Sequence, residues 1–306
     1  MNNQTLKENK EIIILTFFLL FFSLIYFGIE GNKKKNKIEQ NYQKEAVSYD
    51  ADLSKVEAKS FYIYDVYSQK SIFSKNEHEK LPLASITKLM SGLVILDVLP
   101  DTTIVQINKD DIAQEGDTGL IVGEKWKLKG LLDFSLITSS NDGMHALESV
   151  LNSYEQANNK TIINLMNEKA KLIGLKDTVF INSTGVDVDN IVSGAYSSAY
   201  DTAALFSYIF KNNPILISDT KNQSQIFVSE DSIKHFASNT NAIINNIPGI
   251  LASKTGYTNL AGGNLAIIFD AGFMHPIIIA VLYSTEKGRF TDMEKLISIT
   301  LRKLSE

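Results

Sequence analysis

Apolar and polar positions follow two different periods along this chain. Segments 60–66 and 71–74 are rich in β-branched and aromatic residues and are separated by a polar turn, which predicts an antiparallel hairpin. Beyond Ser85 the apolar positions recur every three or four residues, at Ile86, Leu89, Met90, Leu93 and Val94. This spacing predicts an amphipathic helix with its apolar face turned inward and Ser85 at its N-terminus.

Helical patterns continue through the middle of the chain, and strand patterns return after about residue 225. We expect helices at 128–137, 143–151, 161–173 and 201–210. We expect strands at 224–228, 249–255, 264–269 and 276–282, and a closing helix at 291–304. This order predicts an α/β (α+β) fold in which both ends of the chain form one antiparallel sheet. A helical lobe would lie between them, with a cleft at the junction.

The N-terminal region predicts a membrane anchor. Residues 12–29 carry no charge, and as a helix they would extend roughly 27 Å, close to the thickness of the hydrocarbon core of a bilayer. No small-residue cleavage pattern follows, which favours an uncleaved transmembrane segment over a signal peptide. We therefore expect a short leading segment at 1–11, an anchor at 12–29, a polar linker at 30–57 and a catalytic domain at 58–306.

The charges that flank this anchor give a conflicting orientation. Four lysines follow it, at positions 33, 34, 35 and 37, whereas only Lys7, Lys10 and the amino terminus precede it. The positive-inside rule would place the large domain in the cytoplasm. The chemistry described below requires the opposite side of the membrane, and we give it the greater weight.

Composition excludes several classes of function. The chain of 306 residues has a net charge of −5 and no broad basic region, so we expect no nucleic acid partner. It has no cysteine, which excludes disulfides, thiolate metal sites and cysteine nucleophiles. Its four histidines show no metal-binding spacing, and we expect neither a metal ion nor another cofactor.

Ser85 and Lys88 form the first candidate pair for catalysis. A serine hydroxyl is a weak nucleophile that needs a neighbouring base, and residues three apart share one face of a helix. The same Ser-x-x-Lys spacing occurs at 218–221 and 284–287, so the pattern by itself is also typical of a capping serine and a solvated lysine. Only Ser85 is followed by a long apolar-periodic helix that would hold the serine rigidly.

Two further clusters contain residues of the same chemistry. Ser139, Ser140 and Asn141 lie in the short break between two predicted helices, where helix capping is the simplest alternative role. A Lys-Thr-Gly sequence at 254–256 ends a β-rich run, and glycine there permits close approach of another backbone or a ligand. An ordinary turn after a strand is the alternative at this place.

In this order the three clusters match a known set. The chain resembles the serine D-alanyl-D-alanine carboxypeptidases, which are low-molecular-mass penicillin-binding proteins with a β-lactamase/DD-peptidase-like fold. The resemblance extends from about Ala58 to the C-terminus. It rests on "ASITKLM", "SSNDG", "NEKAKLIGLKDTVFINSTGVD", "YSSAYDTAAL" and "KTGYTNLAGGNL". Members commonly have glycine in place of Ser140.

The resemblance implies roles for the catalytic residues. Ser85 would be the acylated nucleophile, and Lys88 would accept its proton. Ser139 and Asn141 would complete the proton relay and contact the substrate. In addition, the backbone N–H groups of Ser85 and Tyr257 would form the oxyanion hole.

The resemblance also implies substrate-binding residues, which are Lys254, Thr255, Gly256 and Tyr257. Lys254 and Thr255 would meet the terminal carboxylate of the substrate. The substrates would be peptidoglycan stem peptides, and β-lactam antibiotics would be covalent inhibitors.

We therefore expect a cell-membrane, single-pass protein whose catalytic domain lies on the extracytoplasmic side. Its activity would be that of a serine D-Ala-D-Ala carboxypeptidase that trims the terminal D-alanine through an acyl-serine intermediate. Two alternatives remain open. One is a DD-endopeptidase that cuts peptidoglycan cross-links, and the other is a catalytically silent module that binds the cell wall.

Overall fold

The computed structural model describes Glu30, Lys35 and residues 49–114, 116, 118–155 and 159–306. The chain divides into two compact units, Met1–Lys55 and Val56–Glu306. Among the described residues, no helix combines the length and apolar character needed to cross a bilayer. The segment at 12–29 lies outside the described residues, and its role as an anchor stays a prediction.

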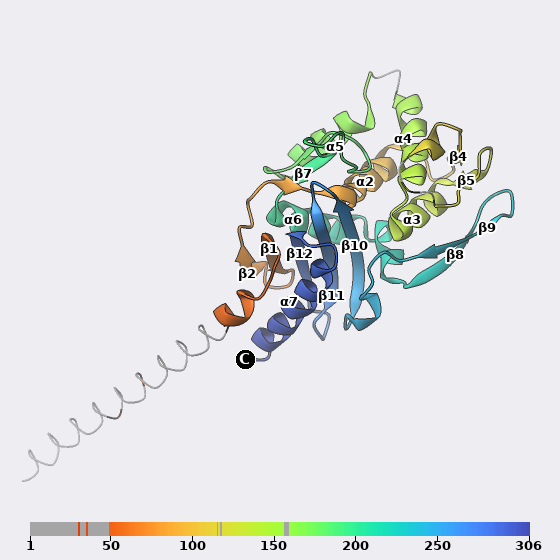
Figure 1. Ribbon diagram of the computed structural model, residues 1–306. Coiled ribbons are helices and arrows are strands. Elements are labelled where there is room, and N and C mark those ends of the chain that lie inside the picture. Colours follow the sequence, from red (N-terminus) through yellow and green to blue (C-terminus); the bar gives the residue numbers. More distant parts are fainter. Residues whose placement is uncertain (1–29, 31–34, 36–48, 115, 117, 156–158) are drawn as a thin grey trace, which may run out of the picture. The chain divides into compact units, whose positions relative to one another are not determined.

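A five-stranded antiparallel sheet forms the centre of the second unit (Figure 1). Its strands, in spatial order, are β10 (Ile250–Thr258), β11 (Gly262–Asp270), β12 (Pro276–Ser284), β1 (Ser60–Asp65) and β2 (Lys70–Lys75). β1 pairs with β12, with Tyr62 opposite Ala280, so both ends of the unit meet within one sheet. The predicted hairpin and the predicted sheet are confirmed.

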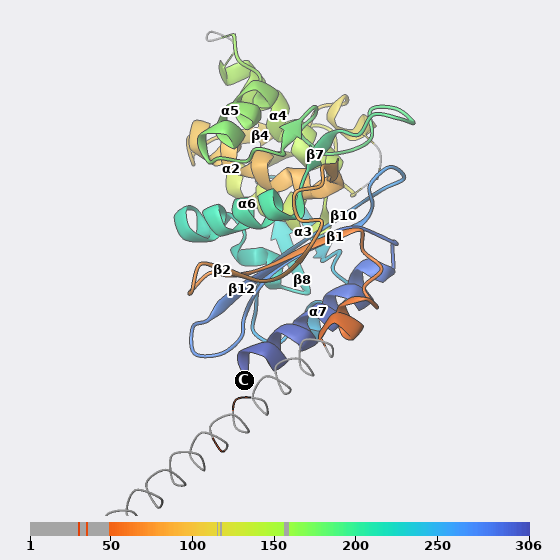
Figure 2. The ribbon, with the colours of Figure 1, turned by 90° about the vertical axis from the view of Figure 1, so that its left-hand side faces the viewer.

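The inner strands are apolar because helices cover both faces of the sheet. Helix α6 (Ala199–Asn212) lies on one side and α7 (Gly288–Leu304) on the other, as the edge-on view in Figure 2 shows. β12 is buried from Ile277 to Leu282, and β11 is buried from Gly263 to Phe269. An inner strand covered on both faces needs apolar residues at consecutive positions, which explains the unbroken runs in the sequence.

The remaining helices form a lobe on the α6 side of the sheet (Figure 1). They are α2 (Lys88–Val98), α3 (Leu128–Thr138), α4 (Asn141–Glu155) and α5 (Ile162–Leu172). All were expected within a few residues of these bounds. For α2 the prediction of one inward face was wrong, because every side chain from Lys88 to Ile95 is buried. Helices α3, α4, α5 and α6 pack around α2, so Lys88 and Ser91 are enclosed with its apolar residues.

Short strands and turns complete the unit. The described residues form three small sheets, which pair β3 (Leu81–Pro82) with β7 (Ala195–Ser197) and β7 with β6 (Val179–Phe180), β4 (Ile104–Gln106) with β5 (Lys125–Lys127), and β8 (Ser224–Val228) with β9 (Lys234–Ser238). The 3₁₀ turns are η1 (Ala84–Thr87), η2 (Asp111–Ala113), η4 (Pro214–Leu216), η5 (Ser218–Lys221) and η6 (Ile244–Asn246).

The β8–β9 hairpin departs from the expected arrangement. β8 was expected as a strand, but it does not join the main sheet. β9 was not expected, because its inward positions are His235 and Ala237 and give no apolar alternation.

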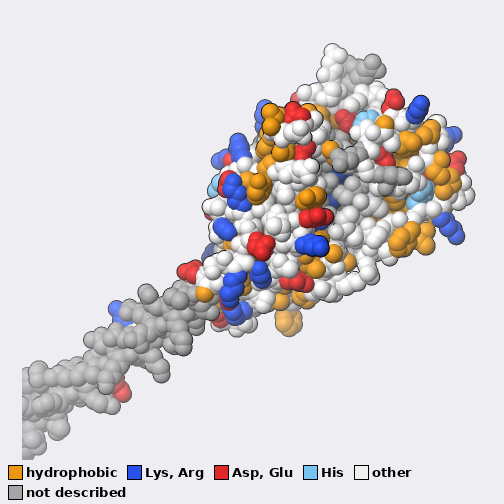
Figure 3. Space-filling model, viewed as in Figure 1, with side chains coloured by type: hydrophobic (Ala, Val, Ile, Leu, Met, Phe, Trp, Pro, Cys, Tyr) orange, Lys and Arg blue, Asp and Glu red, His pale blue; other side chains and the backbone are white. Residues whose placement is uncertain are grey.

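On the face shown in Figure 3, acidic and basic side chains are interspersed over the folded unit.

One buried carboxylate fixes the start of the sheet to the closing helix. Asp292 of α7 accepts hydrogen bonds from the backbone nitrogens of Glu57 and Ala58, at 3.0 and 2.8 Å, and from the Ser284 hydroxyl at 2.8 Å. Unpaired backbone groups are costly when buried, so this carboxylate stabilises the junction of β1, β12 and α7. The junction lies within the strands that position the candidate site.

Candidate active site

The predicted nucleophile lies where the small β3–β7–β6 sheet leads into the lobe. Ser85 is half-buried in η1, immediately before α2. The Asn264 side chain of β11 donates to the carbonyl oxygens of Pro82 and Leu83, at 2.9 and 3.1 Å. These bonds fix the segment that carries Ser85 to the main sheet. Ala84 has φ +50°, a left-handed conformation that is rare for a residue with a side chain and is common at strained functional sites.

The Lys88 amine is buried beside this serine and has three hydrogen-bond partners. Its Nζ lies 2.8 Å from the Ser85 Oγ, 2.7 Å from the Asn141 Oδ1 and 3.0 Å from the Thr184 carbonyl oxygen. The last two atoms can only accept hydrogen bonds, whereas a hydroxyl can donate or accept. A neutral amine has two N–H groups and one lone pair. It therefore satisfies all three partners if Ser85 donates its proton toward the lone pair.

Burial favours this neutral form. The Lys88 side chain is fully buried, and burial lowers its pKa from the ordinary value of 10.5 to about 7. A shift of this size corresponds to roughly 5 kcal/mol of disfavoured charge. Near neutral pH a substantial fraction of the amine can therefore act as a base.

The break between α3 and α4 contributes the second cluster. Ser139 ends α3 in a left-handed conformation, with φ +60°, and its Oγ accepts a hydrogen bond of 2.8 Å from the Lys254 amine. Asn141 begins α4 and directs its amide oxygen to Lys88. Ser140, between these two residues, has other partners. Its Oγ accepts from the Gly143 nitrogen at 2.9 Å and lies 2.7 Å from the Thr118 hydroxyl. Ser140 therefore has the geometry of a helix cap.

The third cluster, Lys254 to Gly256, lies within β10, an edge strand of the main sheet. An added Cβ at Gly256 would lie 2.9 Å from the Leu83 carbonyl oxygen and 3.1 Å from the Ser85 nitrogen, so a side chain there would crowd the backbone of the nucleophile. The Thr255 hydroxyl lies 2.5 Å from that of Thr240. Tyr257, one residue further, lines the same pocket as Ser85.

Lys254 is the second buried amine of the site. Burial lowers its pKa well below the ordinary value, and the positive charges of Lys88 and Arg289 lower it further. Its Nζ also donates to the Thr255 carbonyl oxygen at 2.9 Å. Lys254 thus bonds to Ser139, at the end of α3, and Lys88 bonds to Asn141, at the start of α4. The short break between these two helices therefore contacts both amines.

Sequence reasoning missed Arg289. This largely buried residue at the start of α7 donates from its guanidinium to the Gly256 carbonyl oxygen at 2.8 Å, and the guanidinium lies 6.0 Å from the Tyr257 ring centre. A signal was present, because arginine occurs in this lysine-rich chain only at positions 289 and 302. The planar, permanently charged guanidinium of arginine has several fixed hydrogen-bond donors, whereas lysine has a single ammonium group. A rare arginine in a lysine-rich chain therefore indicates a specific contact.

The loop between β6 and β7 closes the other side of the site. It supplies the Thr184 carbonyl oxygen to Lys88, and its Ser183 carbonyl oxygen accepts from the Ser91 hydroxyl at 2.6 Å. Gly185 has φ +80°, and an added Cβ would lie 2.0 Å from the Ala84 carbonyl oxygen. This close approach packs the loop against the strained residue that precedes Ser85.

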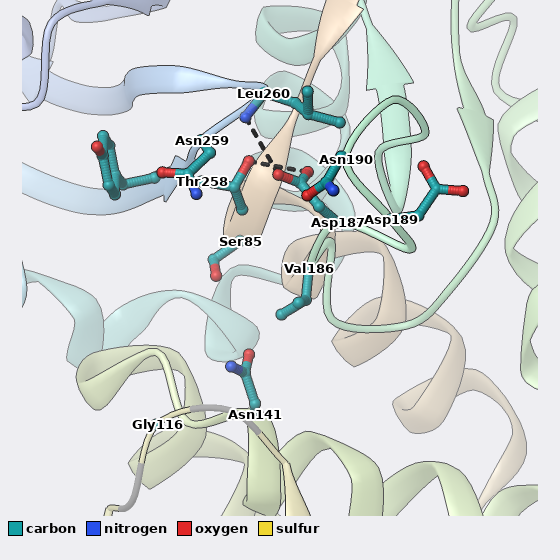
Figure 4. A pocket seen from close by; sticks show the side chains of 11 residues that line it. Ser85, Gly116, Asn141, Val186, Asp187, Asp189, Asn190, Thr258, Asn259 and Leu260 are labelled. Carbon is teal, nitrogen blue, oxygen red and sulfur yellow. Dashed lines mark hydrogen bonds between the residues drawn. The ribbon is translucent and has the colours of Figure 1, made fainter.

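These elements enclose a pocket of about 470 Å³. Figure 4 shows Ser85 in its middle, with Asn141 on one side and side chains of the β6–β7 loop and of the β10–β11 turn on the other. Hydrogen bonds from Lys88 to Asn141 and from Lys254 to Ser139 bring residues of all three predicted clusters together. Of these residues, Ser85 and Lys254 are 169 positions apart in the sequence.

The other serine–lysine patterns do not form such a pair. The Ser218 hydroxyl donates to the Ile215 carbonyl oxygen at 3.1 Å, and the Ser284 hydroxyl donates to Asp292 at 2.8 Å. These two hydroxyls donate to other oxygen atoms, so a structural role fits both serines better than a catalytic role does.

Comparison with known proteins identifies the family. A family model described as D-alanyl-D-alanine carboxypeptidase matches residues 44–284. The chain therefore belongs to the D-alanyl-D-alanine carboxypeptidase family, and the predicted family is confirmed.

Two curated relatives show the range of the family. D-alanyl-D-alanine carboxypeptidase DacF of Bacillus subtilis (strain 168) is 32% identical over 248 residues, which cover 79% of this chain and 61% of the relative. The D-alanyl-D-alanine endopeptidase of Escherichia coli (strain K12) is 28% identical over 228 residues, which cover 73% of this chain and 70% of the relative. The match to this chain thus spans about three fifths of the length of DacF.

A solved structure shows the same fold. Penicillin-binding protein D2 from Listeria monocytogenes, in its ampicillin-bound form, superposes with a TM-score of 0.65 at 23% identity, over 80% of this chain and 97% of that chain. The mixed fold with a central antiparallel sheet, expected from the sequence, is confirmed.

Replacing Gly185 with alanine should disrupt the site. The new Cβ would collide with the Ala84 carbonyl oxygen, so the loop or the Ser85 turn must move. A displacement of about 1 Å can lower a rate by about 10²-fold, and we expect a loss of that order in covalent labelling by a fluorescent penicillin. Gly174→Ala is the matched control, since Gly174 also has positive φ but an added Cβ there meets nothing within 4 Å. Equal labelling of the two variants would contradict this packing argument.

Proposed function

We propose that this chain is a serine D-alanyl-D-alanine carboxypeptidase that removes the terminal D-alanine from peptidoglycan stem peptides. The observation that carries the proposal is the buried Lys88 amine, 2.8 Å from the Ser85 hydroxyl and held in place by two further oxygen acceptors. The family to which the chain belongs supports the choice of substrate. A silent wall-binding module would not need a serine with a buried base beside it.

Acylation would begin with attack of the Ser85 Oγ on the carbonyl carbon of the penultimate D-alanine. The hydroxyl proton passes to the lone pair of the Lys88 Nζ as the new C–O bond forms. The carbonyl oxygen gains the electron pair of its π bond and becomes an oxyanion, which the N–H groups of Ser85 and Tyr257 would stabilise.

Collapse of this intermediate breaks the C–N bond and releases the terminal residue. Its nitrogen takes a proton through Lys88 and Ser139 and leaves as the amine of free D-alanine. Water then attacks the acyl carbon, the bond between that carbon and the Ser85 Oγ breaks, and the Oγ takes a proton from the water as the shortened stem peptide departs with a new terminal carboxylate. A β-lactam would acylate Ser85 in the same way, through opening of its strained amide ring.

Lys254 and Thr255 would receive the terminal carboxylate of the substrate. Lys254 lies within a site that disfavours its charge, because burial and neighbouring cations both lower its pKa. An incoming carboxylate would reverse this balance, since an opposite charge nearby favours the ammonium form. The charged form of Lys254 is therefore unfavourable in the empty site, and the substrate carboxylate would stabilise it by forming an ion pair.

The E. coli endopeptidase relative makes DD-endopeptidase activity the second candidate. The acyl transfer would be the same, with a cross-linking stem peptide in place of free D-alanine as the leaving group. Parallel incubation with a cross-linked stem-peptide dimer separates the two activities.

The direct test is incubation of the full chain with a pentapeptide that ends in D-Ala-D-Ala, followed by measurement of free D-alanine. We expect release by the wild type and a loss of roughly 10⁶-fold in the Ser85→Ala variant, as nucleophile removal causes in serine peptidases. Ser218→Ala, which alters a Ser-x-x-Lys pattern outside the pocket, is the control and should retain full activity. Release that persists in Ser85→Ala would overturn the assignment.

The rate of acylation should rise with pH through the pKa of Lys88. Because this amine is protonated below about pH 7 and must be neutral to act, the rate should fall about tenfold per pH unit well below that value. Lys88→Arg should be inactive at every pH, since a guanidinium does not give up its proton. Lys287→Arg, at an exposed lysine, is the control. A flat profile from pH 5 to 8, or an active Lys88→Arg variant, would show that Lys88 is not the base.

We further propose that residues 12–29 anchor the protein in the cell membrane, with the catalytic domain on the extracytoplasmic side, where peptidoglycan lies. Protease added to intact spheroplasts should then digest the large domain, and a cytoplasmic marker protein should survive. Protection of the domain in spheroplasts, with digestion in inverted vesicles, would establish the orientation that the flanking lysines favour.

A further inference from the structure

A carboxylate in the β6–β7 loop joins the two walls of the pocket. The Asp187 Oδ1 accepts a hydrogen bond of 2.9 Å from the Thr258 hydroxyl, and its Oδ2 accepts one of 3.1 Å from the Leu260 backbone nitrogen. Figure 4 shows both bonds beside the pocket that contains Ser85. Each carboxylate oxygen therefore holds a different residue of the β10–β11 turn.

The turn that Asp187 holds continues directly from the strand of the third cluster. Thr258 is the last residue of β10 and follows Tyr257, whose N–H we assign to the oxyanion hole. The Thr258 hydroxyl also accepts from the Ala261 nitrogen at 3.1 Å, so it links the carboxylate to the far side of the turn. A movement of this turn would thus move the Tyr257 backbone.

The same strand is held from its other side by the closing helix. Arg289 donates to the Gly256 carbonyl oxygen at 2.8 Å, one residue before Tyr257. Asp187 acts one residue after it, from the side of the helical lobe. The peptide nitrogen of Tyr257 is therefore bracketed by two charged side chains that come from different parts of the chain.

The loop that carries Asp187 also contacts the nucleophile segment. The Thr184 carbonyl oxygen, three residues before Asp187, accepts from Lys88, and Gly185, two residues before it, packs against the Ala84 carbonyl oxygen. The position of the turn relative to Ser85 is thus set through one short loop. Donors in an oxyanion hole must lie within a few tenths of an ångström of the developing charge to stabilise it.

We propose that Asp187 is a positioning residue for acylation, which fixes the Tyr257 N–H against Ser85 by joining the β10–β11 turn to the β6–β7 loop. This inference rests on the proposed function. Asp187 touches no reacting atom and acts through Thr258 and Leu260. Its effect should therefore appear in the rate of the chemical step more than in the binding of substrate.

The test compares full-chain variants in D-alanine release from the pentapeptide and in acylation by penicillin. In Asp187→Ala we expect kcat and the acylation rate to fall about 10- to 100-fold, with KM changed by less than about threefold. Asp187→Asn keeps one acceptor oxygen and should fall between the wild type and Asp187→Ala. The matched control is Asp270→Ala, because Asp270 braces the β11–β12 turn through the backbone nitrogens of Gly272 and His275.

Variants of the partner residue keep the proposal testable if Asp187→Ala does not fold. Thr258→Val removes the hydroxyl donor and should lower kcat, whereas Thr258→Ser keeps the donor and should restore it. The double variant Asp187→Asn with Thr258→Val should lose less than the product of the two single losses, because both remove one shared contact.

The outcomes separate this proposal from the proposed function. A wild-type chain that neither releases D-alanine nor reacts with penicillin would overturn the proposed function. A fully active wild type together with a folded Asp187→Ala variant whose kcat matches that of Asp270→Ala would overturn only the positioning role. Equal losses in Thr258→Ser and Thr258→Val would also overturn it.

Discussion

Burial of the Lys88 amine is the constraint on which this site depends. A buried lysine without a carboxylate partner is unfavourable when charged, and its three hydrogen-bond partners here are neutral oxygens. The fold therefore favours a neutral amine near neutral pH and places it beside one hydroxyl. This arrangement disfavours the protonated folded state, and the apolar packing around α2 must offset that cost.

The oxygens that Lys88 requires come from separate parts of the chain. The Ser85 hydroxyl lies on η1, the Asn141 amide begins α4, and the Thr184 carbonyl belongs to the β6–β7 loop. Each segment is held by contacts of its own, such as the Asn264 side chain against the backbone before Ser85. Pre-organisation of this kind means that little rearrangement is needed when a substrate arrives.

The central sheet fixes the position of one wall of the site, because that wall is its edge strand β10. β10 is hydrogen-bonded along its length to β11, and helices cover both faces of the sheet. Arg289 joins the closing helix to the Gly256 carbonyl oxygen, so the C-terminal part of the chain also supports the wall. β1, near the start of this unit, pairs with β12, near its end. A displacement of either strand would therefore be transmitted through the sheet toward the site.

The sequence by itself determined the long helices, the strands of the main sheet and the residue types that carry the chemistry. Periodicity indicated the hairpin, the helices and the inner strands, because covered strands and helices need apolar residues at regular positions. Motif order indicated the three clusters and the family. Only the tertiary structure decided that Lys88 is enclosed on all sides, that Ser140 caps a helix, and that Arg289 and Asp187 brace one strand from opposite sides. These properties arise from contacts between residues far apart in the chain, and no local pattern of residue types records which distant groups will meet.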